Sequence, residues 1–204
     1  MSNAPIYNID LHSFWLNPYP DLKVMRAKTP IAYVPQLGAT LITKRRDIFE
    51  NEKKTTIFSS DQPQGLMTRL MGKNMMRKDG KEHLEERRAI FAAVSPKTTR
   101  LIWKQRFWEF ADTILNQLED HAGGDLVSQY AMPLSAEALK IVTGLTNMSS
   151  NEMNRVSQGM IDGIANYEGD KEIEENCHDC TASIDSHIDD ILGYLSKKPD
   201  SSLL

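Results

Sequence analysis

Apolar residues follow two different patterns along this chain, short runs between turn residues up to about residue 60 and helical spacing from residue 80 onward. Two β-type runs, 31–34 and 40–43, flank the turn signal Pro35-Gln-Leu-Gly38, which predicts a hairpin. Short helices are expected on either side of it, and a further extended stretch after them. These flanking segments are 22–28, 44–51 and, extended, 56–59.

From residue 80 the apolar residues recur every three or four positions, as they do on one face of a helix. Five helices are expected, at 80–95, 97–121, 133–142, 149–167 and 170–195. Ser149 and Glu152 form a capping box for the fourth helix, and the stripe of the fifth includes Cys177 and Cys180. The pattern predicts a mainly α fold with a small N-terminal β-sheet.

Composition narrows the class of protein without indicating an activity. The 204 residues are 40% hydrophobic, and 24 Lys and Arg against 28 Asp and Glu leave a net charge of −4. These values are typical of soluble globular proteins, and the mild acidity argues against nucleic acid or anionic lipid as the main partner. With no signal-peptide pattern, no apolar run near the ~20 residues of a membrane span and only two cysteines, we expect a cytoplasmic protein without a membrane anchor.

The segment 61–79 is interrupted by proline and glycine but rich in methionine. Met67, Met71, Met75 and Met76 are flexible apolar side chains, which suit irregular cores and adaptable binding surfaces alike. The sequence therefore leaves two interpretations open, a core filler and the wall of an apolar pocket.

The first of the five helices carries a cation and an imidazole on its apolar stripe. Steps of three and four residues back from Ile90, Phe91 and Val94 reach Arg87 and then His83. Because a buried, unpaired Arg is costly, an anionic partner is expected there. It could be a distant Asp or Glu of the chain, or a ligand that carries carboxylates or phosphates. A small rotation of the helix would instead leave both side chains half exposed.

The block from Asn74 to Arg88 resembles the start of the C helix of cytochromes P450. It has an apolar pair, Met75-Met76, a turn at Asp79-Gly80 where the family usually has proline, and then His-x-x-x-Arg-Arg. Other segments resemble the family in the same order: 17–22, 30–34, 41–48 and 58–60 its N-terminal helix and first sheet, 133–145 its E helix, and the two helices after it F and G. The resemblance covers essentially all 204 residues.

The resemblance implies a P450-like fold that is incomplete, spanning the helices A to G. In that frame 1–204 is the N-terminal half of a single domain, composed of an N-terminal segment with the hairpin (1–60), a loop that overhangs the substrate (61–79) and a helical region (80–204). The join at 164–171 resembles the lid between helices F and G, whose opening admits substrate.

The resemblance also implies an activity, that of a soluble bacterial-type haem-thiolate monooxygenase. Such an enzyme activates O2 to oxidise a small organic substrate and takes electrons from a ferredoxin- or flavodoxin-type donor. His83 and Arg87 would then bind the propionates of haem b, which are the buried anions that this helix face requires. The alternative is a haem-free helical binding module, whose His83 and Arg87 hold an intramolecular carboxylate or another anion.

The catalytic signatures of the family's C-terminal half do not occur in the sequence. There is no Phe-x-x-Gly-x-x-x-Cys loop, and the strings Glu85-x-x-Arg88 and Glu152-x-x-Arg155 come too early in the family's order to be its Glu-x-x-Arg element. We therefore expect no catalytic residue and no metal ligand in this stretch, which alone would be inactive. The axial Cys is expected beyond residue 204.

Three smaller features have competing interpretations. Cys177-His-Asp-Cys180 could bind zinc or act in redox chemistry, but both cysteines lie on an apolar stripe, which favours the core. Trp103 and Trp108 are expected to be packing residues. A set of basic residues is either a solvated face or, as in the family, the surface that receives an acidic electron donor. The basic set comprises Lys78, Lys81, Arg88, Lys97, Arg100 and Lys104.

Overall fold

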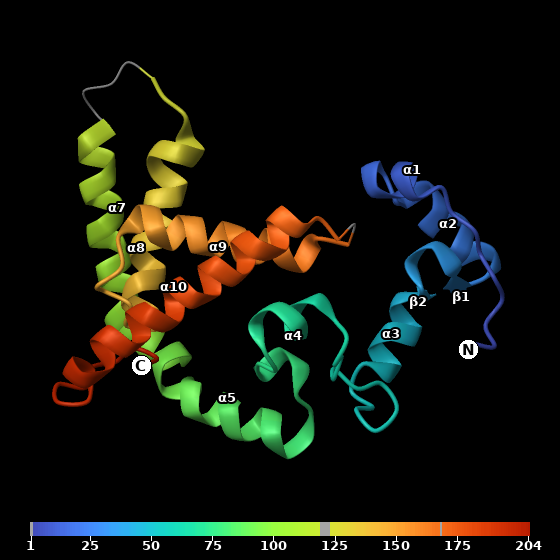
Figure 1. Ribbon diagram of the computed structural model, residues 1–204, viewed down its shortest axis with the longest axis horizontal. Helices are drawn as coiled ribbons and strands as arrows, with labels where there is room; N and C mark the ends of the chain where they lie inside the picture. Colours follow the sequence, from blue (N-terminus) through green and yellow to red (C-terminus); the bar gives the residue numbers. More distant parts are fainter. Residues whose placement is uncertain (1, 119–122, 168) are drawn as a thin grey trace. The chain divides into compact units, whose positions relative to one another are not determined.

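A computed structural model describes residues 2–118, 123–167 and 169–204 of the chain, shown in Figure 1. The chain divides into two compact units, Met1–Ser59 and Ser60–Leu204, which are described separately. The assignment of both to one domain stays a prediction.

The first unit is built around a two-stranded antiparallel sheet. Ile31 pairs with Ile42 and Val34 with Ala39, while Gly38, at φ 60°, closes the turn in a left-handed conformation that glycine adopts readily. The predicted hairpin is confirmed. The elements of this unit are α1 (Leu11–Leu16), α2 (Tyr19–Lys28), β1 (Ile31–Val34), the 3-10 helix η1 (Pro35–Leu37), β2 (Ala39–Ile42) and α3 (Arg45–Asn51).

Two predictions for this unit need correction. The stretch 56–59 is not extended, because the amides of Ile57 and Phe58 both donate to the carbonyl of Lys54 and close a turn. Helix α1 was not expected; the Asp10 carboxylate caps it by accepting from the Ser13 amide. The core of the unit consists of Ile9, Phe14, Met25, Ala32 and Val34.

The second unit is helical throughout its regular elements, so the mainly α fold with a small N-terminal sheet is confirmed. Its longer helices are α5 (Gly80–Val94), α7 (Lys104–Leu118), α8 (Met132–Thr143), α9 (Ser150–Ala165) and α10 (Lys171–Leu195). Its shorter elements are α4 (Leu66–Met71), η2 (Met75–Arg77), α6 (Pro96–Thr98), η3 (Thr99–Trp103) and η4 (Val127–Ala131).

All five predicted helices are present. The one expected at 97–121 begins as α6, passes through one π turn, η3, and continues as α7; its expected end lies outside the described residues. The Ser149 hydroxyl accepts from the Glu152 amide, which confirms that end of the capping box. Gly144 ends α8 at φ 90°, and Asp170 caps α10.

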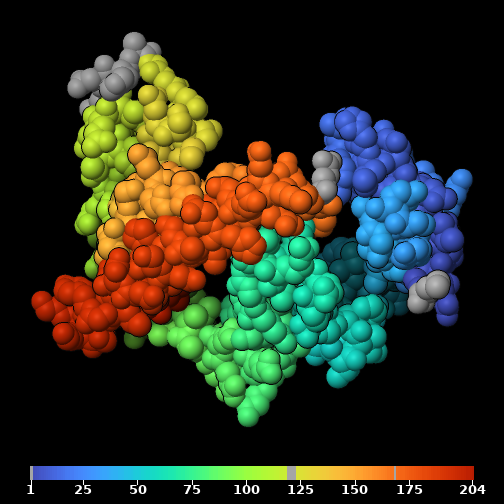
Figure 2. All heavy atoms as spheres, in the orientation of Figure 1, coloured from blue at the N-terminus to red at the C-terminus, as the bar shows by residue number. Residues whose placement is uncertain are grey.

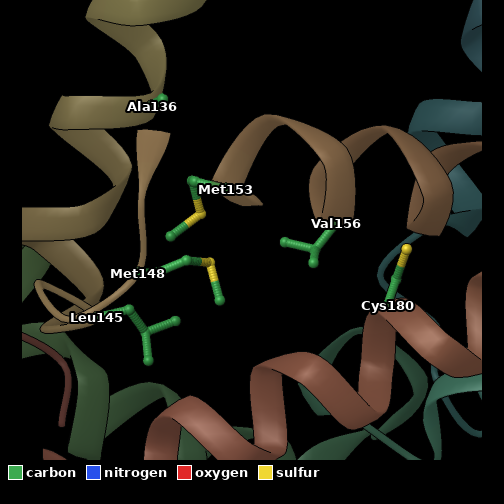
Figure 3. Close-up of a cluster of buried hydrophobic side chains, with 6 residues drawn as sticks. All are labelled: Ala136, Leu145, Met148, Met153, Val156 and Cys180. Atoms are coloured by element: carbon green, nitrogen blue, oxygen red, sulfur yellow. The ribbon is translucent and has the colours of Figure 1, made fainter. Parts of the chain in front are cut away.

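The core of this unit lies between α8, α9 and α10. Figure 3 shows the side chain of Met153 reaching from α9 toward Met148, with Val156 on the same side of α9. The buried cluster consists of Ala136, Leu145, Met148, Met153, Val156 and Cys180. Within the described residues, no helix is both long enough and apolar enough to cross a membrane.

Candidate functional site

Helix α5 presents His83 and Arg87 one turn apart, His83 half-buried and Arg87 exposed. In the part of the chain that the structure describes, neither side chain has a hydrogen-bond or ion-pair partner. The intramolecular Asp or Glu that the sequence left open as a partner is therefore not found among the described residues. Two neighbouring cationic or hydrogen-bonding groups remain available to an anion from outside these residues.

The expectation that the apolar stripe of α5 faces the core is wrong for the described residues. Phe91 is 51% exposed and Val94 45%, whereas the buried residue of α5 is Ala93. The reason is that α5 packs chiefly against two short elements, η2 and α6, which leave most of the stripe uncovered. Arg87 therefore reaches solvent without a desolvation cost, and the helix presents an apolar face with a cation on it.

That face is hollowed around Arg87. Leu84, Arg87, Arg88 and Phe91 line a depression with a volume of 240 Å³, and Leu84 is itself 48% exposed. Apolar walls around a guanidinium suit a ligand that is apolar but carries an anionic group.

The turn that begins α5 differs from a proline turn for a geometric reason. Gly80 has φ 55°, which the ring of proline cannot adopt. Asp79 does not cap the helix; its carboxylate accepts from the Ser60 amide, with N and O 2.9 Å apart. An ion pair between Lys78 and Glu86 further fixes the first turns of the helix.

The methionine-rich segment contains a short helix, α4, which the sequence did not predict. Leu70 is buried, Met75 is half-buried and Met76 is 60% exposed. Arg69 on α4 forms an ion pair with Glu174 on α10 at 3.6 Å. The segment therefore combines one buried anchoring residue, Leu70, with several accessible methionines. It has features of both interpretations left open by the sequence, the core filler and the wall of an apolar pocket.

The prediction that the cysteines belong to the core is confirmed. Cys177 and Cys180 are fully buried on α10, where they face Gly163 and Gly159 of α9. Burial raises the pKa of both thiols. Protonated thiols packed against glycine backbone are suited to filling space rather than to ligation or redox chemistry.

A charge network between α9 and α10 was missed by sequence reasoning, which considered Glu152-x-x-Arg155 only as a match to the family's Glu-x-x-Arg element. Arg155 donates through Nε and Nη2 to the two carboxylate oxygens of Glu152, at 2.8 and 2.7 Å, and through Nη1 to Asp179 at 2.8 Å. The Ser183 hydroxyl donates to Glu152 as well. Arg155 and Ser183 together lower the pKa of Glu152 to about 2. The i, i+3 spacing within α9 was the signal that could have indicated the Glu152–Arg155 pair.

Trp103 and Trp108 have opposite environments. Trp103 is buried and its Nε1 donates to the Ala93 carbonyl at 2.7 Å, as expected for a packing residue. Trp108 is 59% exposed, so the packing prediction is wrong for it. The reason is that Trp108 lies on a side of α7 that borders an open groove of 740 Å³, lined chiefly by apolar side chains and flanked by Arg100 and Lys104.

The basic residues around α5 to α7 divide into paired and unpaired members. Lys78, which precedes α5, forms an ion pair with Glu86 of α5, and Lys81 forms one with Glu85 on the same helix. The other four have no ion-pair partner among the described residues and are exposed; these are Arg88, Lys97, Arg100 and Lys104.

No family model matches the sequence, but solved structures match the fold. Substrate-free CYP109E1 from Bacillus megaterium superimposes with a TM-score of 0.74 at 18% identity over 93% of this chain and 50% of its own. P450BioI, solved in complex with an acyl carrier protein that carries hexadec-9Z-enoic acid, gives 0.74 at 15% identity over 95% and 52%. CYP109B1 from Bacillus subtilis gives 0.71 at 18% over 92% and 49%.

The chain therefore has the fold of part of a bacterial cytochrome P450, as the resemblance predicted. It spans about half the length of the P450 structures that it matches. At these identities the likeness establishes the fold alone.

Proposed function

We propose that this chain forms the N-terminal half of a haem-thiolate monooxygenase that oxidises a small organic substrate with O2. Haem b would supply the activation of O2 at its iron, with a Cys thiolate from outside residues 1–204 as axial ligand. The residues of this chain would anchor the haem, line the substrate pocket and offer a surface to an electron donor.

The single observation that carries the proposal is the His83–Arg87 pair, which has no partner among the described residues and lies on an apolar face of a P450-type fold. Haem combines a large apolar ring with two carboxylates, and α5 combines exposed apolar residues such as Phe91 with two groups that bind carboxylates. Arg87 can donate two parallel hydrogen bonds to one propionate, and His83 can donate one to another oxygen. The residues present therefore fit the group.

The substrate pocket is proposed to use the methionine-rich segment 61–79 and the join at 164–171. Accessible, flexible methionines such as Met76 provide an apolar wall that adapts to the shape of a ligand. CYP109E1, which has this fold, was solved in complex with two apolar ligands, corticosterone and testosterone. An apolar organic substrate is the class that these features support.

The electron donor is proposed to dock on the basic surface of α5 to α7. Arg88, Lys97, Arg100 and Lys104 are exposed and unpaired among the described residues, so they remain available to an acidic partner. The exposed ring of Trp108 beside Arg100 and Lys104 adds an aromatic contact of the kind that concentrates binding energy at interfaces. A ferredoxin- or flavodoxin-type protein has the required charge.

The haem-free binding module is the less favoured candidate. It needs an anion within the chain for His83 and Arg87 or a ligand of unrelated chemistry, and the described residues provide no such carboxylate. The match to P450 structures adds weight against it.

The test is an absorption spectrum of the purified full-length protein, oxidised and then reduced under carbon monoxide. The expected result is a Soret band that moves to the red on carbon monoxide binding in the manner of thiolate-ligated haem. Absence of a Soret band after reconstitution with haem would refute the proposal and favour the binding module. A Soret band without the thiolate shift would retain haem binding but refute the thiolate ligand.

A further inference from the structure

Helix α4 packs against both helices of the pair α9–α10, and the three helices meet at Gly163. A Cβ atom built on Gly163 would lie 3.2 Å from Cδ1 of Leu70 and 2.7 Å from Cβ of Cys177. The absence of a side chain at Gly163 thus creates a notch, which Leu70 enters from α4 and Cys177 from α10. Leu70 is 4% exposed there, and the Arg69–Glu174 ion pair joins α4 to α10 as well.

The pair α9–α10 is itself closely joined over its length. Gly159 and Gly163 let the backbone of α9 approach Cys180 and Cys177, and the Arg155 network links the helices on one side. Glycine at a helix–helix contact lets the two backbones approach closely. If α9 slid past α10, the sulfur atoms of Cys177 and Cys180 would lose their contacts with Gly163 and Gly159.

A side chain links the end of α9 to the start of α10. Nδ2 of Asn166 donates to the Asp170 carbonyl at 2.7 Å, and Oδ1 of Asn166 accepts from the Asp170 amide at 2.9 Å. Asn166 is 5% exposed, so both hydrogen bonds are shielded from water. The two hydrogen bonds tie the C-cap residue of α9 to the N-cap residue of α10, within the join 164–171 that is expected to act as a lid.

We propose that Leu70 is a positioning residue, which holds the methionine-rich segment to α9–α10 so that α4, α9 and α10 move as one cap over the substrate. This proposal rests on the proposed function, which identifies the space beneath these helices as the substrate pocket. Release of Leu70 from the notch at Gly163 is then the event that separates the methionines from the helix pair. Figure 2 shows the turquoise segment that contains α4 directly against the orange end of the helix pair.

The first test is amide hydrogen exchange of the full-length protein and its Leu70→Ala variant. Exchange in 66–71 is expected to become about tenfold faster, while α9–α10 keeps its protection, because α4 loses its anchor and the helix pair does not. Leu101→Ala is the matched control, since Leu101 lies on η3 and is 66% exposed. Unchanged exchange in α4, or an equal rise throughout 60–204 that marks a general core residue, would overturn the proposal.

The second test measures access to the haem in the reconstituted protein. The probe is 4-phenylimidazole, an azole whose ring nitrogen ligates haem iron, and the observable is its association rate from the Soret shift. Leu70→Ala is expected to raise this rate several-fold without changing the final shift, and Leu70→Met to restore it. An unchanged rate would overturn the gating role. If the protein binds no haem, the proposed function fails, and the exchange experiment still decides whether Leu70 anchors α4.

Discussion

Gly163 of α9 faces Cys177 of α10 so closely that a methyl group on Gly163 would lie 2.5 Å from the Cys177 sulfur. Gly159 faces Cys180 in the same way one turn earlier. The two Cys side chains thus occupy the space that the missing glycine side chains leave, and this pairing sets the distance between the helices. The two cysteines act in these contacts through their size, and this role requires neither a disulfide nor a metal ion.

Gly163→Ala is expected to lower the free energy of unfolding by about 1–3 kcal/mol, because the added methyl group displaces the side chains of Cys177 and Leu70 from their packed positions. The measurement is urea unfolding followed by circular dichroism. Gly193→Ala is the control, since Gly193 lies within α10 with open space around its Cα. That control is expected to gain about 0.5–1 kcal/mol from helix propensity alone. Equal effects of the two substitutions would disprove the close approach.

Acidification is expected to weaken the contact between α9 and α10. The pKa of Glu152 falls from 4.5 to about 2 in the folded protein because Arg155 and Ser183 hydrogen-bond its carboxylate. A carboxylate whose pKa is lowered by folding stabilises the folded state above its unfolded pKa, and this contribution is lost as the pH falls from 4.5 towards 2. Glu152→Gln is therefore expected to lower Tm at pH 7 and to flatten the fall of Tm across that window.

The control for this experiment is Glu175→Gln, because Glu175 is exposed on the same helix pair. It removes one negative charge without removing a partner of Arg155. If Glu175→Gln flattens the profile as much as Glu152→Gln, net charge rather than the Arg155 network causes the pH dependence.

The elements that sequence reasoning predicted are those whose signal is local. Long apolar periodicities and caps such as Ser149 specify α5 to α10 without reference to the rest of the molecule. Helix α4 has six residues between Gly65 and Gly72, too few for a periodicity, and its buried Leu70 meets Gly163, almost a hundred positions later.

The sequence predicted how the residues of the candidate site are spaced along α5, but not how far their side chains are buried. The i, i+4 relation of His83 and Arg87 follows from helical geometry alone. Whether Phe91 and Val94 are buried depends on what packs on α5, and the described residues that contact it cover little of the stripe. For Trp108 the sequence indicated an aromatic packing residue, but the partner that would cover it is likewise a tertiary feature that no local pattern records.

The two thiols are expected to be inert in the native protein. Burial both blocks access to Cys177 and Cys180 and raises their pKa values, which lowers the fraction of reactive thiolate. With 5,5′-dithiobis(2-nitrobenzoic acid) at pH 8, the native protein is expected to react at least about a hundredfold more slowly than the urea-unfolded protein. Fast reaction of either Cys in the native state would contradict the seating of the sulfurs against α9.

The proposed anchoring of haem makes an ordered prediction for α5. Arg87→Ala is expected to speed the transfer of haem to excess apomyoglobin by about tenfold, because it removes two charge-assisted hydrogen bonds to a propionate. His83→Ala is expected to have a smaller effect, since imidazole can donate one bond. The transfer rate of Arg87→Lys is expected to fall between those of the parent and Arg87→Ala, because Lys keeps the charge and loses the planar guanidinium group.

Arg26→Ala, at an exposed position of α2, is the control for charge alone. Transfer rates that are equal in the parent and in all four variants would remove His83 and Arg87 from the haem site, whereas a larger effect at His83 would reverse their proposed order.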